Sequence, residues 1–464
     1  IFGIVITSIG IMSYGLYSSY DRNYSNQFIQ IEDCEEKLAT QLGKNKNYSE
    51  IIKTIMSEDN SFYRIAKVPH QVQNLSIHYG YASTECFLSI GNKYVYKLNE
   101  ELADNNYSTT SSIRGMGDRT KITTLLGTKY YVVDENNENS IPYGYSLKYE
   151  NEGVKGYKNN FTLPIGVCYQ SYLLKEEYEK LNPIEKEEAI LKTAVIENKE
   201  ILNGLNIEEK KDLGDIENSY YEVQYEMIDD NNICKLAEES LSKIITKVKN
   251  EEITLKIPQI QNAEIYIWIS DFEFKSNDKH TITATFKEKS VSKTIDNKIT
   301  SAYYQPAPNV LLNLGYYEQA EGKIKLKFSA KGTYEFKTIK VIAVPMENYE
   351  KTIQELQRNA LTDVHVSNNQ IKGKVNLDND SILQITTSYT TGWKAYIDGM
   401  QVETFPVNTA FIGIPVQSGE HEIVLKYEVP YLKEGIVCSI IGLISLFIII
   451  VLEKKKQWSF YRLT

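Results

Sequence analysis

The sequence is poor in the residue types that build disulfide frameworks and metal sites. Its 464 residues include only five cysteines and five histidines. No two cysteines form a C-x-x-C pair, and their spacing is not typical of a small disulfide-bonded domain. Four of them could still pair outside the membrane, but we expect free, mostly buried thiols. The cysteines are Cys34, Cys86, Cys168, Cys234 and Cys438.

Recognisable catalytic motifs are also missing. The histidines are dispersed, and no two of them have the spacing of a zinc motif. No Ser/His/Asp set can be recognised. Paired acidic residues such as Glu238 and Glu239 are adjacent, not three or four positions apart as helical neighbours would be. The sequence therefore predicts no catalytic residue, no metal site and no cofactor site within this chain.

Excess positive charge is lacking as well. The formal net charge is −10, and four basic residues against one acidic residue follow residue 452, so residues 1–452 carry −13. An acidic surface is a poor clamp for a polyanion, and we expect no nucleic-acid partner. The 35 Tyr and 14 Phe are too many for a disordered chain. The composition thus predicts folded domains, two or three of them at this length.

Charge is absent altogether from residues 435–452, and three lysines follow Glu453. At about 1.5 Å per residue, a helix over this run roughly matches the hydrocarbon core of a bilayer. Basic residues beside a span favour its cytoplasmic side. We therefore expect a transmembrane helix over residues 435–452 and a basic cytoplasmic tail over 453–464. Membrane lipid is then a partner, and the preceding segment is extracytoplasmic.

A second stretch without charge opens the chain. Residues 1–17 are apolar or weakly polar, and Asp21 and Arg22 end the stretch. A secretory signal peptide is one interpretation. Because the stretch has neither an initiator Met nor a basic leader, we favour a truncated transmembrane helix over residues 1–20. A further partner would then be a missing N-terminal membrane domain of the same protein.

The pattern between these stretches predicts an α+β membrane-anchored ectodomain flanked by two transmembrane helices. Residues 21–250 are expected to form a mixed α/β membrane-proximal unit, in which Asn182 and Pro183 start a helix. Antiparallel β-sandwich-like domains follow, because the apolar period changes to two after residue 250. They comprise a β-sandwich-like domain over 251–345, an amphipathic connecting helix over 346–362 and a second β domain over 363–431.

The expected strands of these β domains are short. Asp398 and Gly399 predict a two-residue hairpin turn between two of them, because type I′ turns require positive φ. The strands are expected over residues 254–257, 264–269, 281–286, 310–314, 323–328, 337–344, 381–389, 393–397, 410–414 and 420–427.

Several segments, taken together, resemble the C-terminal part of the YfhO family of bacterial membrane proteins. The strongest match is the run S-Y-T-T-G-W-K-A-Y-I-D-G at residues 388–399, which continues through 407–414 and 418–423. Shorter matches lie upstream and keep their order along most of the chain. They cover residues 62–65, 79–81, 125–133 and 160–166.

This resemblance implies a glycosyltransferase of the GT-C class. Such proteins take a sugar from a polyprenyl-phosphate carrier and add it to a cell-surface polymer, with lipoteichoic acid the usual suggestion in Gram-positive members. The class keeps its chemistry in the first outer loop and neighbouring membrane helices, where an acidic residue serves as base or metal contact. A divalent metal and a polyprenyl-phosphate-linked sugar are thus implied for the full-length protein, and a glycan acceptor for this ectodomain.

Three groups of side chains are candidates for a glycan or phosphate contact, and each also has a structural interpretation. Guanidinium and carboxylate groups on the turn over residues 114–119 could hold a phosphate, or fix the turn through an Arg–Asp pair. Aromatic rings could stack on sugars, or pack in a core, hairpin or membrane interface. The candidates are Tyr79, Tyr81, Arg114, Asp118, Arg119, Trp393 and Tyr396.

Two classes of function remain open from the sequence. The first is an acceptor-positioning ectodomain of a membrane glycosyltransferase. The second is a non-catalytic cell-surface ectodomain for glycan binding, adhesion or sensing. No LPxTG-like motif precedes residue 435, which disfavours wall anchoring, and the short tail after Lys456 disfavours a sensor with its own signalling domain.

Overall fold

The computed structural model describes residues 46–68, 74–88, 91–104, 107–109, 112–202, 204–237, 240–301 and 304–461. The transmembrane helix predicted over residues 1–20 lies outside these ranges. Residues Glu50–Tyr427 form one compact unit, and the described residues after Tyr427 belong to a second unit.

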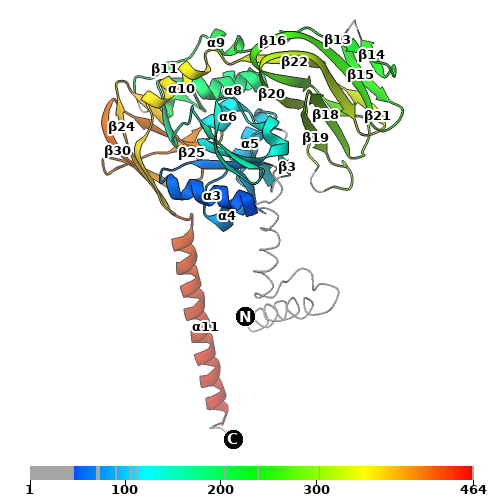
Figure 1. Ribbon diagram of the computed structural model, residues 1–464. Helices are drawn as coiled ribbons and strands as arrows, with labels where there is room; N and C mark the ends of the chain where they lie inside the picture. Colours follow the sequence, from blue (N-terminus) through cyan, green and yellow to red (C-terminus); the bar gives the residue numbers. More distant parts are fainter. Residues whose placement is uncertain are drawn as a thin grey trace. The chain divides into compact units, whose positions relative to one another are not determined.

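A mixed α/β region occupies the first part of the large unit (Figure 1). Its elements are α3 (Lys46–Glu58), β1 (Arg64–Val68), α4 (Leu75–Tyr79), β2 (Glu85–Phe87), α5 (Lys93–Glu101), β3 (Tyr107–Thr109), β4 (Ser112–Arg114), α6 (Thr120–Leu125), β5 (Thr128–Asp134), η1 (Glu135–Ser140), β6 (Tyr145–Asn151) and β7 (Val154–Asn159). They form a four-stranded sheet in the order β1-β5-β7-β6 and a small sheet in the order β2-β4-β3. Only the β1–β5 pair of these sheets is parallel.

The mixed region continues through a parallel three-stranded sheet in the order β10-β9-β11. The elements of this second part of the mixed region are β8 (Gly166–Tyr169), β9 (Ser171–Leu174), α7 (Lys175–Lys180), α8 (Pro183–Lys192), β10 (Ala194–Ile196), η2 (Lys199–Leu202), β11 (Glu208–Glu209) and α9 (Gly214–Glu217). The helix start predicted at Asn182 and Pro183 is confirmed, because Asn182 caps α8 in a capping box with Glu185.

Two antiparallel sheets follow, which we call the two-sheet region (residues 221–345). The larger sheet has the order β12-β22-β16-β20-β18-β19 with β13 beside β16, and the smaller has the order β14-β15-β21-β17. Side chains from both sheets contribute to one hydrophobic core. The strands are β12 (Tyr221–Val223), β13 (Glu226–Ile228), β14 (Cys234–Ala237), β15 (Ser240–Thr246), β16 (Glu251–Ser270), β17 (Glu273–Phe274), β18 (His280–Phe286), β19 (Lys289–Ile295), β20 (Asn309–Phe328), β21 (Gly332–Glu335) and β22 (Thr338–Pro345).

The predicted division of this region into short strands is wrong at two places. The strands expected over 254–257 and 264–269 are parts of β16, and those over 310–314 and 323–328 are parts of β20, each 20 residues long. The β16–β20 pairing shifts register between Ile257 and Ile260, on either side of Pro258. A bulge can accommodate a proline that cannot donate to the ladder, so Pro258 does not end the strand.

The C-terminal part of the large unit is a helix followed by two further sheets. Their orders are β23-β24-β30-β26-β27 and β28-β29-β25-β8, so β8 from the mixed region completes the second sheet by pairing with β25. The elements are α10 (Tyr349–Arg358), β23 (Thr362–Val366), β24 (Gln370–Leu377), β25 (Ser381–Ser388), β26 (Trp393–Ile397), β27 (Met400–Val402), β28 (Phe405–Val407), β29 (Phe411–Val416) and β30 (Gly419–Tyr427).

The predicted hairpin turn in this part is confirmed. Asp398 has φ 50° and Gly399 has φ 83°, and the two residues connect the paired strands β26 and β27. Both central residues thus have the positive φ that a two-residue hairpin of this type requires.

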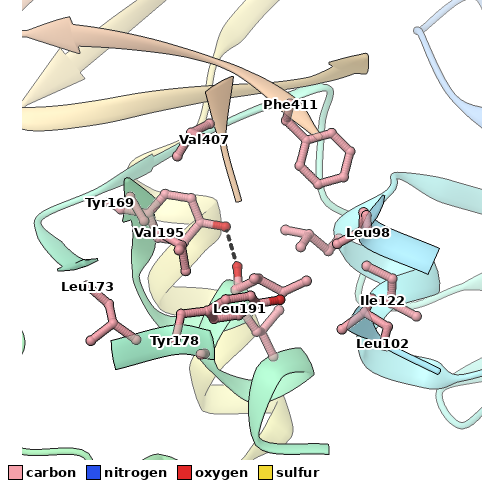
Figure 2. Close-up of a cluster of buried hydrophobic side chains, with 14 of the residues drawn as sticks. Leu98, Leu102, Ile122, Tyr169, Leu173, Tyr178, Leu191, Val195, Val407 and Phe411 are labelled. Carbon is pink, nitrogen blue, oxygen red and sulfur yellow. Dashed lines mark hydrogen bonds between the residues drawn. The ribbon is translucent and has the colours of Figure 1, made fainter. Parts of the chain in front are cut away.

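Buried side chains from separate segments meet in the core between α5, α6, α8 and the neighbouring strands. Figure 2 shows Leu98, Ile122, Tyr169, Val195 and Val407 in this cluster. The Tyr169 hydroxyl donates a hydrogen bond of 2.8 Å to the carbonyl oxygen of Ile190, which satisfies a polar group within the apolar core. Residues more than 200 positions apart therefore share one core.

The second unit contains α11 (Leu432–Tyr461). Within the part of the chain that the structure describes, one helical stretch, Leu432–Lys454, is long and apolar enough to cross a membrane. This stretch includes the transmembrane helix predicted over residues 435–452. The other predicted transmembrane helix, over residues 1–20, is outside the described residues.

Candidate functional site

The turn over residues 114–119, which we call the glycine turn, connects β4 to α6. Gly115, Gly117 and Asp118 have φ of 80°, 66° and 55°, so three of its residues have left-handed backbone conformations. Glycine adopts this conformation without steric cost, which explains two of these positions. Arg119 then occupies the N-cap of α6.

Arg119 is buried and paired at the end of this turn. Its Nε donates a 2.8 Å hydrogen bond to Glu187 of α8, Nη2 contacts the same carboxylate, and Nη1 donates to the Leu102 carbonyl oxygen at 2.6 Å. Burial alone would lower the pKa of Arg119, but attraction to Glu187 leaves this pKa above its ordinary value. The guanidinium therefore binds α8 to the turn.

Asp118 is held by its neighbours in a similar way. The Tyr131 hydroxyl donates a hydrogen bond to its carboxylate, and Asn313 Nδ2 donates to the carbonyl oxygens of Gly117 at 3.2 Å and Asp118 at 3.0 Å. Burial and the Asp118 carboxylate raise the pKa of Tyr131 well above its usual range. These contacts attach the glycine turn to β5 and β20.

A buried carboxylate joins the mixed region to the two-sheet region beside this turn. Glu264 of β16 accepts hydrogen bonds from the Thr120 amide at 3.2 Å and the Tyr266 hydroxyl at 2.7 Å. Burial raises the pKa of Glu264, although both hydrogen bonds oppose that shift.

The cavity beside the glycine turn has a volume of about 10 Å³ and is lined by Gly115, Asp118 and Tyr131 among others. This is room for about one water molecule. The geometry favours the structural interpretation of Asp118 and Arg119, with Glu187 and not Asp118 as the arginine's partner. Arg114 is exposed at the end of β4, and a ligand contact there stays a prediction.

The predicted aromatic contacts lie on two different parts of the large unit. Tyr79 ends α4 and Tyr81 follows Gly80, which has φ 76°; both rings are half-buried. Burial raises the pKa of Tyr81, with a smaller effect of nearby Glu85. Because Glu85 pairs with Arg114 across β2 and β4, Tyr81 lies near the predicted basic position.

Trp393 and Tyr396 lie on β26, in the five-stranded sheet. The Trp393 ring centroid is 5.3 Å from that of Tyr427, and Lys426 Nζ is 5.4 Å from the Tyr396 ring centroid. Both residues are half-buried by these neighbours on β30. The contacts account for the two rings through hairpin packing, and a glycan contact stays a prediction.

Sequence reasoning did not identify a polar cleft of about 550 Å³ between α10 and the strands of the mixed region. Lys192 and Lys210 line it and both approach Asp215, with Nζ–carboxylate distances of 3.4 and 2.9 Å. Lys351, Glu208 and Glu355 add further charged groups, and amide and hydroxyl side chains also line the cleft. The amide and hydroxyl side chains are Gln170, Ser171, Asn348, Thr352 and Asn359. No motif marks these residues, because they come from separate segments that only the fold brings together.

Metal-ligating side chains do not gather in the described ranges: these contain no group of three or more His, Cys, Asp or Glu placed to hold an ion. The divalent metal that the GT-C resemblance implies therefore has no fitting donor set among these residues.

A family model described as bacterial membrane protein YfhO matches residues 5–439. The chain belongs to the YfhO family. The sequence resemblance is thus confirmed, and the chain belongs to a family of bacterial membrane proteins, consistent with the apolar stretch in α11.

A YfhO relative from Bacillus subtilis (strain 168), described as an uncharacterized protein, is 24% identical over 474 residues. The match covers 98% of this chain and 50% of the relative. The chain therefore spans about half the length of that relative, so any activity of a whole YfhO protein is a proposal for this chain.

Solved structures give weak similarities to this YfhO chain. The arabinofuranosyltransferase AftD from Mycobacteria (mutant R1389S, class 2) is 12% identical, with a TM-score of 0.15, over 33% of this chain and 13% of that chain. Latent PorU from Porphyromonas gingivalis is 7% identical, with a TM-score of 0.19, over 65% and 32%. TM-scores this low support no conclusion about fold or function.

Proposed function

We propose that this chain is the extracytoplasmic and C-terminal membrane portion of a GT-C-like glycosyltransferase. The enzyme transfers a sugar from a polyprenyl-phosphate carrier to a cell-surface polymer such as lipoteichoic acid, and this portion positions the acceptor. Membership of the YfhO family and the GT-C resemblance of that family support the proposal.

The observation that carries acceptor positioning is the 550 Å³ polar cleft. Its volume lies in the range of small-molecule sites. Its amide and hydroxyl groups match sugar hydroxyls, and Lys351 on α10 adds a cation that suits the phosphates of a teichoic acid. The cleft thus offers both kinds of contact that a glycosylated polyol phosphate needs.

The transfer itself requires groups beyond those described above. The acceptor hydroxyl oxygen bonds to the sugar's anomeric carbon while the bond from that carbon to the carrier phosphate breaks, and the carrier leaves as its phosphate. In an inverting reaction, a base accepts the hydroxyl proton. The GT-C resemblance assigns that role to an acidic residue of the membrane domain, so this chain's share is to hold the acceptor.

The proposal is tested by mass spectrometry of envelope polymers from a strain that lacks the full-length gene. We expect loss of a hexose or N-acetylhexosamine mass, and its return with the complete wild-type gene. The complete gene carrying Lys351→Glu in the cleft should restore it poorly. The matched charge reversal Lys323→Glu, at an exposed position of β20, should restore it fully.

Unchanged polymers in the deletion strain would overturn the transferase proposal. They would favour the alternative from the sequence, a non-catalytic ectodomain for glycan binding, adhesion or sensing. Full restoration by the Lys351→Glu gene would instead retain the transferase and refute the role of the cleft.

A further inference from the structure

Exposed apolar side chains gather on α4 and at the end of β2. They are Ile77, Phe87 and Leu88, at 71%, 44% and 47% exposure, and we call them the α4–β2 patch. The patch shares no residue with the polar cleft. Apolar side chains that a folded surface presents together are typical of a contact with a membrane or another protein.

Hydrogen bonds of Asn74 fix the arrangement of this patch. Asn74 occupies the N-cap of α4, where its Nδ2 donates to the Phe87 carbonyl oxygen and its Oδ1 accepts from the Phe87 amide, both at 2.7 Å. The Ile77 amide donates to the Asn74 carbonyl oxygen at 3.1 Å. The end of β2 is thus attached to the first turn of α4, and the two segments present their apolar side chains together.

A series of contacts within the large unit connects the patch to the end of β30. Leu88 is four positions before Asn92, whose Nδ2 donates a 2.9 Å hydrogen bond to the Tyr389 carbonyl oxygen. Tyr389 is four positions before Trp393, whose ring centroid is 5.3 Å from that of Tyr427. Each of these four-residue steps spans at most about 14 Å. Figure 1 shows α4 at the lower edge of the large unit, where β30 also ends.

The end of β30 is attached to the apolar stretch of α11 by a short segment. Four residues separate Tyr427, the last residue of β30, from Leu432, where that stretch begins. Such a segment can extend at most about 18 Å. The chain itself therefore keeps the end of β30 close to the membrane surface, and with it the part of the large unit that carries the patch.

Aromatic and basic side chains lie along the same series of contacts. The Tyr94 ring packs edge-on against Tyr389 with centroids 5.3 Å apart, and Lys93 Nζ is 4.8 Å from the Tyr94 centroid. Tyr and Trp are enriched at the level of the lipid headgroups, and the long side chain of Lys reaches the headgroups from an apolar surface. This composition favours lipid as the partner of the patch.

We propose that the α4–β2 patch inserts into the interfacial region of the lipid bilayer that anchors the chain. Its three side chains lie at the boundary between headgroups and acyl chains, as the apolar faces of interfacial segments do. The large unit then contacts the membrane through its own surface as well as through α11. This contact requires neither the polar cleft nor sugar transfer.

Fluorescence of the full chain in lipid nanodiscs tests this proposal. A version with its native cysteines replaced receives Ile77→Cys or, as the matched control, Ile299→Cys, an isoleucine of the two-sheet region that is 73% exposed. Each cysteine carries an environment-sensitive fluorophore, and the nanodiscs contain phosphatidylcholine and phosphatidylglycerol with or without a lipid that bears a nitroxide near the headgroup. We expect a blue-shifted emission and loss of fluorescence to the nitroxide at position 77, and neither at position 299.

A charge placed in the patch provides the second measurement. With the label at position 77, Leu88→Asp should reduce the quenching, because a carboxylate resists transfer out of water. Val248→Asp, at a 60% exposed position of the two-sheet region, should leave the quenching unchanged.

The proposal is refuted if the labels at positions 77 and 299 are quenched equally, or if Leu88→Asp behaves like Val248→Asp. A label at position 77 that is shielded from water but not quenched would also refute it, and would mean that another protein segment covers the patch. Its failure is separable from that of the transferase proposal, because no sugar is present and every variant lies outside the polar cleft.

Discussion

At the residue scale, we expect the buried pair of Arg119 and Glu187 to be sensitive to substitution. Both side chains are nearly inaccessible, at 3% and 5% exposure. Arg119→Leu leaves the Glu187 carboxylate buried without its cation, and breaking such a pair costs about 3–5 kcal/mol. We expect the free energy of unfolding, measured by urea titration of the purified chain, to fall by that amount.

Arg114→Leu provides the matched control, since Arg114 is exposed five positions earlier in the same turn. Surface substitutions usually change stability by within about 0.5 kcal/mol. Equal effects of the two variants would contradict the structural role assigned to Arg119.

The buried Glu264 carboxylate lies where the two-sheet region meets the mixed region, and we expect it to make the free energy of unfolding depend on pH. Burial raises its pKa in the folded chain. The folded state therefore holds the proton more tightly than the unfolded state, and stability is lost as pH rises through the folded pKa. Glu264→Gln removes this titration and retains hydrogen-bonding groups. We expect the variant to gain stability relative to wild type as pH increases above about 4.

The measurement is the free energy of unfolding of both proteins at a series of pH values. Glu321→Gln, at an exposed position of β20, is the control and should follow the wild-type curve. Parallel curves for Glu264→Gln and wild type would show that the buried carboxylate does not couple folding to pH.

At the element scale, the start of α8 depends on Asn182. Its Oδ1 accepts hydrogen bonds from the backbone amides of Ile184 at 2.9 Å and Glu185 at 3.0 Å, and the Glu185 carboxylate accepts one from the backbone amide of Asn182 at 2.8 Å. Loss of a helix cap costs about 0.5–2 kcal/mol. We expect Asn182→Ala to reduce the free energy of unfolding within that range.

A second asparagine offers the comparison within the same chain. Asn348 occupies the N-cap of α10 but makes no capping hydrogen bond with its side chain. Thermal unfolding followed by circular dichroism should therefore show a smaller shift for Asn348→Ala than for Asn182→Ala. A shift of the same size would mean that the capping hydrogen bonds of Asn182 do not add to the stability of the chain.

Element positions could be predicted where the signal is local. The β26 strand at residues 393–397, the turn at Asp398 and Gly399 and the start of α8 all follow from short patterns of alternation or capping. The length of β16 could not be predicted, because a bulge at Pro258 depends on the partner strand β20. The partner of Arg119 was missed because Glu187 is 68 positions away and on another helix.

At the scale of the whole molecule, long-range pairing determines how the expected units are joined. Strand β8, from the range predicted as the mixed unit, pairs with β25, and Glu264 of β16 binds Thr120 of α6. These contacts join residues that are more than 140 positions apart, and no local pattern encodes them. The polar cleft depends on the same assembly of distant segments, which is why it was not found from the sequence.

The orientation of the chain across the membrane is the remaining prediction at this scale. The three lysines that follow the apolar stretch of α11 favour a cytoplasmic tail. In a version whose native cysteines are replaced, Ser367→Cys, at an exposed position between β23 and β24, should react with a membrane-impermeant maleimide in intact cells. Lys456→Cys should react only after the membrane is permeabilised.

The cysteine-free parent sets the background for both labels. Reaction of Lys456→Cys in intact cells would reverse the orientation and place the large unit in the cytoplasm. That result would remove the cell-surface glycan as acceptor, because a polymer outside the membrane could not reach the polar cleft. The topology measurement therefore decides whether the polar cleft and its proposed acceptor lie on the same side of the membrane.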